Sequence, residues 1–241
     1  MVSGVLIGGK YGAVLPTSVP GCVWWLDAAD TNTIVLNGAD VTQWNDKSGG
    51  NYSVAQTTPS KQPLYDIGSL NSLNSIKFTA AGQEGLITTA GATFANKGHS
   101  VFIIVKPIAV TDSDVLGTGG ITAGNILVMF FGSYGRGHDF RNGSNAVIDS
   151  TAAADADAIH LLGQILNDAE TAFSVNLDGS LTSVAVAGAA VTPNTTLTMP
   201  GRDTVTYSNV SIGEVLIYNR EVSESERTRI QTYLKDKWAY V

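Results

Sequence analysis

Turn-forming residues interrupt this 241-residue chain about every 8 to 12 residues from Val23 onward, and this rhythm restricts the fold more than any other feature. No helical pattern of comparable strength separates one β-like segment from the next, which disfavours βαβ units and a parallel sheet. The sequence therefore predicts an all-β antiparallel sandwich. The expected strands are 22–28, 75–80, 100–108, 125–131, 145–150, 158–167, 171–179, 181–188 and 210–219.

The clearest hairpin is expected in "FSVNLDGSLTSV", where two β-rich arms flank Asp178 and Gly179. Both residues adopt positive φ readily, as a tight turn requires. We therefore interpret this Asp-Gly pair as a turn and not as a calcium ligand.

The chain ends in a strong helix pattern. Ser223 and Glu226 form the S-x-x-E capping box, which satisfies backbone donors at a helix start. Acidic residues fall in the first turn and basic residues in the last, as the helix dipole favours. The apolar stripe of this helix consists of Ile230, Tyr233, Leu234 and Trp238.

The strand before this helix is apolar on both faces at 215–218, so both faces need a cover. One cover is the opposing sheet, and we expect the helix to be the other. The helix would then be a structural lid, because burying each large apolar side chain contributes about 1.5 to 3 kcal/mol.

Residues 1–19 are Gly-rich and apolar and form a predicted arm ahead of a single domain over 20–241. Two interpretations of the arm stay open: an edge strand or frayed tail, or a segment that docks on another subunit. Lys10 interrupts the apolar stretch, which disfavours a secretory signal.

Charge, hydropathy and cysteine content argue against several classes of protein. The formal net charge is -7, with 14 basic and 21 acidic residues and no basic cluster, which argues against nucleic-acid binding. No apolar run approaches the roughly 20 residues that span a bilayer. The single cysteine, Cys22, excludes an intramolecular disulfide and is expected to be a small core residue.

Both ends of the chain resemble one family. "GEVLIYNREVSESERTRIQTYLKDKW" near the C-terminus, and "VWWLDAADTNTI" with a following W-x-D-x-S-G turn near the N-terminus, are similar to laminin G-like, or concanavalin A-like lectin/glucanase, modules. Such modules occur in bacterial surface proteins and in tailed-phage particles. The resemblance frames residues 22–238 and implies a two-sheet jelly roll with the C-terminal helix outside. In the turn, Trp44, Asp46 and Ser48 are expected to fix the backbone through side-chain hydrogen bonds.

Catalysis is not expected. Glucanases of this fold carry, by the resemblance, acids at alternating positions of one strand, so that two carboxyl groups flank the scissile bond. Here Glu214 is followed on its face by Leu216 and Tyr218. We therefore predict that Glu214 is a structural carboxylate paired with a nearby base, such as Arg220 or Arg227, or with backbone donors. The alternative is a ligand of a sugar or a cation.

No cofactor is required, and calcium is the one cofactor that the resemblance suggests, since some laminin G-like modules hold it with Asp side chains. Asp149, Asp155 and Asp157 could supply such oxygen ligands, and the alternative is a solvated acidic loop. The histidines, His99, His138 and His160, lie in separate segments without zinc-ligand spacing. We expect His160 to be a hydrogen-bonded strand residue.

One glycine-rich stretch, "FFGSYGRGHDFRNG", gathers aromatic and planar polar side chains that suit a saccharide or protein contact. The alternative is a hairpin whose polar residues face water. The candidate ligand-binding residues are Tyr134, Arg136, His138, Asp139 and Arg141.

These observations predict a non-catalytic binding or structural module on the surface of a virion, as a capsid decoration, head-fibre or tail component. Its partners would be other virion proteins or its own copies, contacted through residues 1–19. The second hypothesis is a carbohydrate-binding adhesin on a bacterial cell surface, with cell-surface glycans as partners. A glycan hydrolase is the third and weakest.

Overall fold

Short antiparallel strands and one C-terminal helix make up the part of the chain that the structure describes. The computed structural model describes residues 15–89, 98–108, 113–118, 128–131, 139–141, 147–149, 157–169, 171–185, 197–201 and 207–240. The strands are β1 (Cys22–Asp27), β2 (Ile34–Asn37), β3 (Asp40–Trp44), β4 (Val54–Ala55), β5 (Leu64–Leu70), β6 (Leu73–Phe78), β7 (Leu86–Thr88), β8 (His99–Pro107), β9 (Ser113–Thr118), β10 (Val128–Phe131), β11 (Asp139–Arg141), β12 (Val147–Asp149), β13 (His160–Leu166), β14 (Ala172–Leu177), β15 (Ser180–Ala185), β16 (Leu197–Met199) and β17 (Val210–Tyr218). The helices are the 3-10 turns η1 (Pro16–Ser18), η2 (Thr31–Thr33) and η3 (Pro59–Lys61), and the α-helix α1 (Glu224–Trp238).

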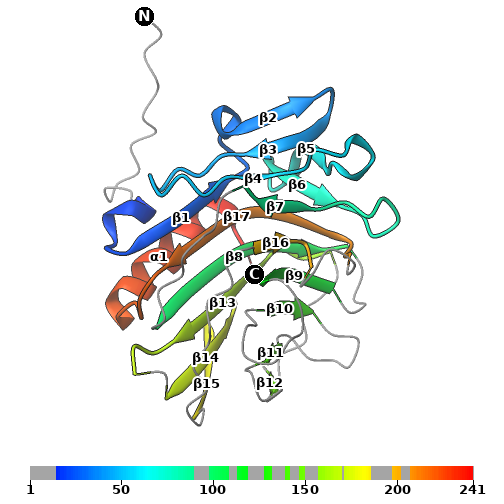
Figure 1. Cartoon of the computed structure of the whole chain (residues 1–241). Coiled ribbons are helices and arrows are strands. Elements are labelled where there is room, and N and C mark those ends of the chain that lie inside the picture. The colour runs from blue at the N-terminus through cyan, green and yellow to red at the C-terminus, as the bar shows by residue number, and fades with distance from the viewer. Residues whose placement is uncertain are drawn as a thin grey trace, which may run out of the picture.

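Strand β17 lies in the middle of the sheet (Figure 1). It pairs antiparallel with β1, β6 and β8. Among the described residues, the strand order runs β10-β9-β16-β7-β4-β3-β5-β6-β17-β8-β13-β14-β15, with β1 beside β17 and β2 beside β3. All of these pairings are antiparallel, so the predicted fold class is confirmed.

One apolar core, here called the inner core, shows that the sheet folds over itself into two layers. Leu116 of β9 and Leu177 of β14 come from near opposite ends of the strand order, yet both belong to this core. Trp24 and Trp44 are buried in the same core. Residues so far apart in the order share one core only if the strands curve into facing layers, as a sandwich requires.

A second core, here called the outer core, lies between the sheet and helix α1. Along β17, Val215 and Ile217 face the inner core, whereas Leu216 and Tyr218 face the outer core. Ile230, Leu234 and Trp238 of α1 are buried against this outer face. The helix therefore covers the second face of β17, and the predicted lid is confirmed.

The start of α1 has the predicted capping box. The hydroxyl of Ser223 accepts a hydrogen bond from the backbone N–H of Glu226, and the Glu226 carboxylate accepts one from the N–H of Ser223. Arg220 lies 2.6 Å from the same carboxylate. This guanidinium and the Ser223 backbone lower the pKa of Glu226 to about 2.

The end of the predicted arm, residues 15–19, packs on its own domain. Val19 is buried in the outer core, and the hydroxyl of Tyr218 donates a hydrogen bond to the carbonyl of Pro16. Residues 1–14 lie outside the described residues, so docking of the arm on another subunit stays a prediction. Cys22 packs half-buried against the same core, and burial raises the pKa of its thiol to about 12.

The predicted hairpin joins β14 and β15. Asp178 and Gly179 occupy its turn with φ values of 51° and 96°, and Leu177 pairs with Ser180. The Asp178 carboxylate also lies 2.8 Å from Nδ1 of His160, which confirms His160 as a hydrogen-bonded strand residue.

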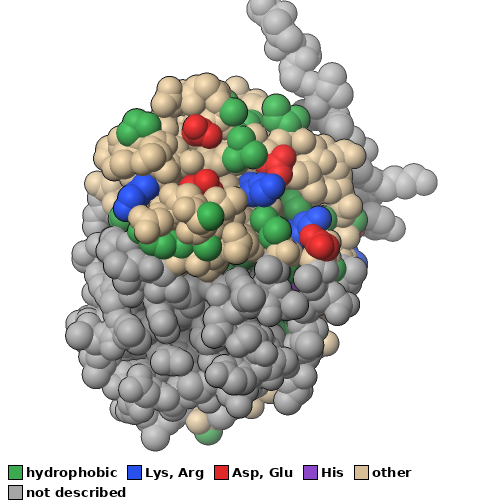
Figure 2. All heavy atoms as spheres, turned by 90° about the vertical axis from the view of Figure 1, so that its right-hand side faces the viewer, with side chains coloured by type: hydrophobic (Ala, Val, Ile, Leu, Met, Phe, Trp, Pro, Cys, Tyr) green, Lys and Arg blue, Asp and Glu red, His purple; other side chains and the backbone are tan. Residues whose placement is uncertain are grey.

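One face of the described surface carries a mixture of apolar and charged side chains (Figure 2). Figure 2 shows hydrophobic side chains scattered on one face, with basic and acidic side chains among them. Single exposed apolar residues of this kind are normal for a folded domain. Within the described residues, no helix is both long enough and apolar enough to cross a membrane.

Candidate functional site

Glu214 of β17 is completely buried, and four donors surround its carboxylate. The indole N–H groups of Trp25 and Trp238 donate to it at 2.7 and 2.6 Å. The Tyr233 hydroxyl and the Lys237 ammonium each lie 2.8 Å away. Glu214 therefore pairs with a nearby base, as predicted, but in the described structure this base is Lys237 and not one of the two suggested arginines, Arg220 and Arg227. The reason is geometric: position 214 faces the last turns of α1, whereas Arg220 reaches Glu226 in the first turn.

Asp27 of β1 is the cross-strand neighbour of Glu214 and completes the cluster. Its carboxylate lies 2.7 Å from the Lys237 ammonium and 2.9 Å from that of Lys47. Burial raises the pKa of Glu214, and the Lys237 ammonium opposes that rise. Two buried acids neutralised by ammonium groups hold strands and helix together, which is the structural role predicted for Glu214.

Asp46 fixes the turn after β3 through backbone donors. Its carboxylate accepts from the N–H groups of Trp25 and Ser48 at 2.9 and 2.8 Å, and from the N–H of Tyr52 at 3.3 Å. The hydroxyl of Ser48 lies 2.8 Å from the Val23 carbonyl. These contacts attach the turn to β1.

Trp44, by contrast, does not fix this turn by a hydrogen bond. Its side chain is fully buried in the inner core, and its indole nitrogen has no partner among the described residues. Trp44 therefore contributes packing at the start of the turn, where a polar role was expected.

The predicted ligand-binding loop falls mostly outside the described residues. Tyr134, Arg136 and His138 lie outside them, and Asp139 and Arg141 begin and end strand β11. This strand pairs with β12, and Asp139 stands opposite Asp149 in the register. Binding by this loop stays a prediction.

The predicted calcium ligands are only partly within the described residues. Asp149 ends strand β12, and Asp155 lies outside the described residues. The exposed carboxylate of Asp157 lies 3.7 Å from the Lys106 ammonium. Calcium binding therefore stays untested for this set of residues.

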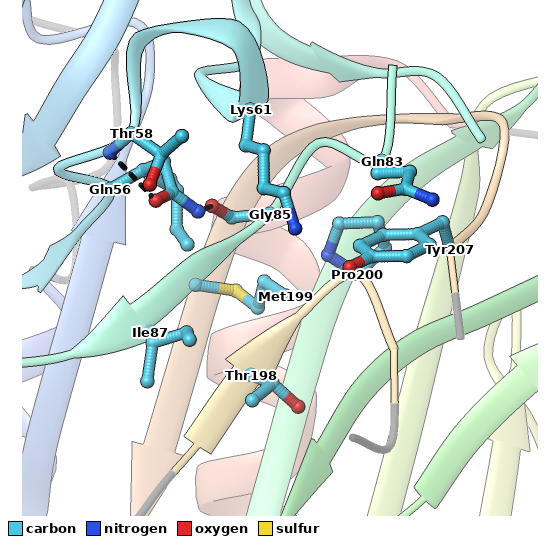
Figure 3. Close-up of a pocket in the computed structure, with 11 residues that line it drawn as sticks. Gln56, Thr58, Lys61, Gln83, Gly85, Ile87, Thr198, Met199, Pro200 and Tyr207 are labelled. Atoms are coloured by element: carbon cyan, nitrogen blue, oxygen red, sulfur yellow. Dashed lines mark hydrogen bonds between the residues drawn. The ribbon is translucent and has the colours of Figure 1, made fainter. Parts of the chain in front are cut away.

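A pocket of about 190 Å³ lies where β7, β16 and η3 meet (Figure 3). Antiparallel pairing places Thr198 and Met199 beside Ile87 and Leu86. In this view Met199 and Ile87 form an apolar floor, and both Pro200 and the ring of Tyr207 line the pocket. We call it the Tyr207 pocket. Its described lining residues are Gln56, Thr58, Lys61, Gln83, Gly85, Leu86, Ile87, Thr198, Met199, Pro200 and Tyr207.

The polar side of the Tyr207 pocket is held by the backbone of its own walls. The Gln56 amide donates to the Gly85 carbonyl at 2.9 Å and accepts from the N–H of Thr58 at 3.0 Å. The N–H of Gly85 donates to the Lys61 carbonyl at 3.1 Å. The Lys61 ammonium lies 5.9 Å from the centre of the Tyr207 ring. This arrangement can hold a small polar ring between an aromatic face, an ammonium group and amides.

Sequence reasoning missed this pocket because its walls come from three distant segments, 56–61, 83–87 and 198–207. The one local signal was the pair of prolines, Pro59 and Pro63, that flank Lys61 and restrict its backbone. A second, more open hollow of about 260 Å³ contains Lys106 and Asp157, whose charges face each other.

No protein-family model matches the chain, and no curated protein matches its sequence. Solved structures match its fold. The binding domain of Paraclostridial Mosquitocidal Protein 1 aligns with a TM-score of 0.62 and 10% identity, covering 92% of this chain and 53% of that one. The botulinum neurotoxin serotype D/C binding domain gives a TM-score of 0.61 and 11% identity, covering 91% and 53%.

An enzyme is also among the similar structures. Trypanosoma rangeli sialidase in complex with sialic acid aligns with a TM-score of 0.58 and 18% identity, covering 98% of this chain and 35% of that one. The chain thus spans about half of each toxin binding domain and about a third of the sialidase. At such identities the likeness shows the fold alone. It agrees with the lectin-like sandwich that the sequence resemblance implied.

Proposed function

We propose that this chain is a non-catalytic binding module that recognises saccharides at the Tyr207 pocket. The observation that carries this proposal is the composition of the pocket: an aromatic face, an apolar floor and a polar rim around a space of about 190 Å³. Sugar rings present an apolar C–H face and a polar edge, so they complement such a pocket. Similar structures described as binding domains agree with this class of function.

A binding role is favoured over hydrolysis because the two carboxyl groups that the fold places side by side, those of Asp27 and Glu214, are buried and paired with an ammonium group. Glycoside hydrolysis takes two carboxyl groups on either side of a scissile bond. Asp27 and Glu214 are adjacent, but both are buried beneath α1 and both contact Lys237. Release of reducing ends from a polysaccharide by the purified protein would contradict the non-catalytic assignment.

The binding proposal is tested on a glycan array with the wild-type chain and two variants. Tyr207→Ala should weaken binding on the order of tenfold, because the aromatic face of the pocket is lost. The melting temperature of the variant, measured alongside, separates this loss from a loss of folding. Arg136→Ala is the matched variant in the predicted loop. If Arg136→Ala abolishes binding and Tyr207→Ala does not, the saccharide site is in the loop instead.

The setting that we propose is the surface of a virion, with a bacterial cell surface as the alternative. The support is the sequence resemblance at both chain ends to modules of tailed-phage particles, and the apolar character of residues 1–19. Co-assembly of the protein with capsid or tail proteins, lost on deletion of residues 1–14, would support this setting. Recovery only from bacterial envelopes would favour the alternative.

A further inference from the structure

Lys61 is the one positively charged side chain among the described residues that line the Tyr207 pocket. By contrast, an aspartate forms an ion pair with each of three other described lysines, Lys47, Lys106 and Lys237. No described carboxylate forms such a pair with Lys61, whose ammonium instead faces the Tyr207 ring at 5.9 Å. The pocket therefore carries a positive charge that its described residues leave uncompensated.

The position of this charge is set by the fold. Lys61 ends the short helix η3, where Pro59 fixes the first residue and the N–H of Gln62 bonds back to the Pro59 carbonyl. The Lys61 carbonyl accepts the N–H of Gly85 from the opposite wall. Figure 3 shows the Lys61 side chain reaching down between these walls toward Tyr207. Half-burial of the residue restricts its stem, so the ammonium is placed in the pocket.

The size and lining of the pocket around Lys61 determine which kind of anion it can bind. A space of about 190 Å³ is smaller than the sites that hold drug-sized ligands, so it suits a single sugar ring. The apolar floor and the Tyr207 ring favour a flat C–H face over a fully hydrated inorganic ion. The net charge of -7 repels anions at long range, so any affinity for one has to arise from local contacts.

We propose that the Tyr207 pocket selects an acidic sugar, whose carboxylate contacts the Lys61 ammonium while its ring lies against Tyr207. This inference rests on the proposed function and adds the charge class of the ligand. The ammonium acts as a point donor to the carboxylate in a half-buried site, where a charged hydrogen bond is stronger than at an open surface. Uronic and sialic acids share this chemistry.

The test uses matched acidic and neutral probes. NMR titration compares methyl glucuronide with methyl glucoside, and the methyl glycoside of sialic acid with its uncharged methyl ester. The acidic member of at least one pair should bind about five- to tenfold more tightly. Lys61→Gln should bring this ratio to about one, Lys61→Arg should keep it, and rising salt should reduce it. Lys77→Gln, on β6 outside the pocket, is the control and should leave the ratio unchanged.

The outcomes separate this inference from the proposed function. If both members of each pair bind equally and perturb the pocket resonances, the acidic preference is wrong and the saccharide site stands. A preference that persists in Lys61→Gln also overturns the inference. If no probe binds and the glycan array is blank, both proposals fail.

Discussion

Asp27 and Glu214 stand opposite each other in the antiparallel register of β1 and β17, and one ammonium group, that of Lys237, contacts both carboxylates. The two strands are far apart in the sequence, and Lys237 lies on the helix that follows β17. The cluster therefore connects the start of the domain, its central strand and its C-terminal helix at one buried point.

Removal of the shared ammonium should destabilise the domain. Lys237→Met keeps most of the apolar stem but leaves Asp27 and Glu214 facing each other without their common counter-charge. Because a buried charge without its partner is costly, we expect a loss of about 2 to 4 kcal/mol in the free energy of unfolding. Urea denaturation at pH 7 measures it. Lys235→Met, two residues earlier on the exposed side, is the control and should cost less than about 1 kcal/mol.

His99 should make stability depend on pH. It is buried at the start of β8, and this burial lowers the pKa of its imidazole from 6.5 to about 4. Between these values the unfolded chain binds a proton that the native protein does not, so native stability falls as pH falls from 6.5 to 4. The expected loss is roughly 2 to 3 kcal/mol.

The variant His99→Gln isolates this contribution, because glutamine does not titrate. Urea unfolding at several pH values between 7 and 4.5 should show a shallower decline for the variant than for the wild type. Parallel declines in the two proteins would mean that His99 is not the group responsible.

Glu226 should contribute to folding stability, and this contribution should be lost at lower pH than that of His99. Its pKa is lowered from 4.5 to about 2, mainly by the Arg220 guanidinium, so its contribution is present above pH 4.5 and is lost as pH falls toward 2. Glu226→Gln should cost about 1 kcal/mol at pH 7, the usual worth of a helix cap. Thermal unfolding should show the difference between variant and wild type shrinking at low pH. Glu224→Gln is the matched control, because Glu224 lies in the same helical turn while Arg220 contacts Glu226. An equal loss of stability in the two variants would contradict the role assigned to Glu226.

The parts of the fold that were predictable from sequence are those with local signals. The capping box at Ser223 and the apolar stripe of α1 lie within one segment, and so does the Asp178-Gly179 turn. Strands such as β2 and β5 were absent from the predicted set because their burial is irregular: only Tyr65 and Leu70 of β5 are buried, while Ile67 is 78% exposed. Without a buried face, a strand carries little hydrophobic alternation.

The sites were less predictable, because they depend on contacts between distant segments. Glu214 was recognised as a structural acid, but its partner Lys237 became evident only once α1 was placed across β17. Asp27 was visible in the W-L-D-A motif, yet nothing local indicates that it lies opposite Glu214. The Tyr207 pocket likewise exists only where β7 and β16 pair.

The close approach of Gly213 and Trp238 should give a measurable coupling energy between the two sites. Gly213 lies at the register shift of β17, and a Cβ atom there would lie 2.8 Å from the Cη2 atom of the Trp238 ring. Gly213→Ala should therefore push the helix from the sheet and cost about 1 to 3 kcal/mol, as overpacking does. In a Trp238→Leu background the ring is gone, and the same alanine should cost much less, because the two sites are coupled through this contact. Urea denaturation of the four proteins in this double-mutant cycle gives the coupling energy. An equal cost of Gly213→Ala in both backgrounds would show that the helix does not rest on the strand at this glycine.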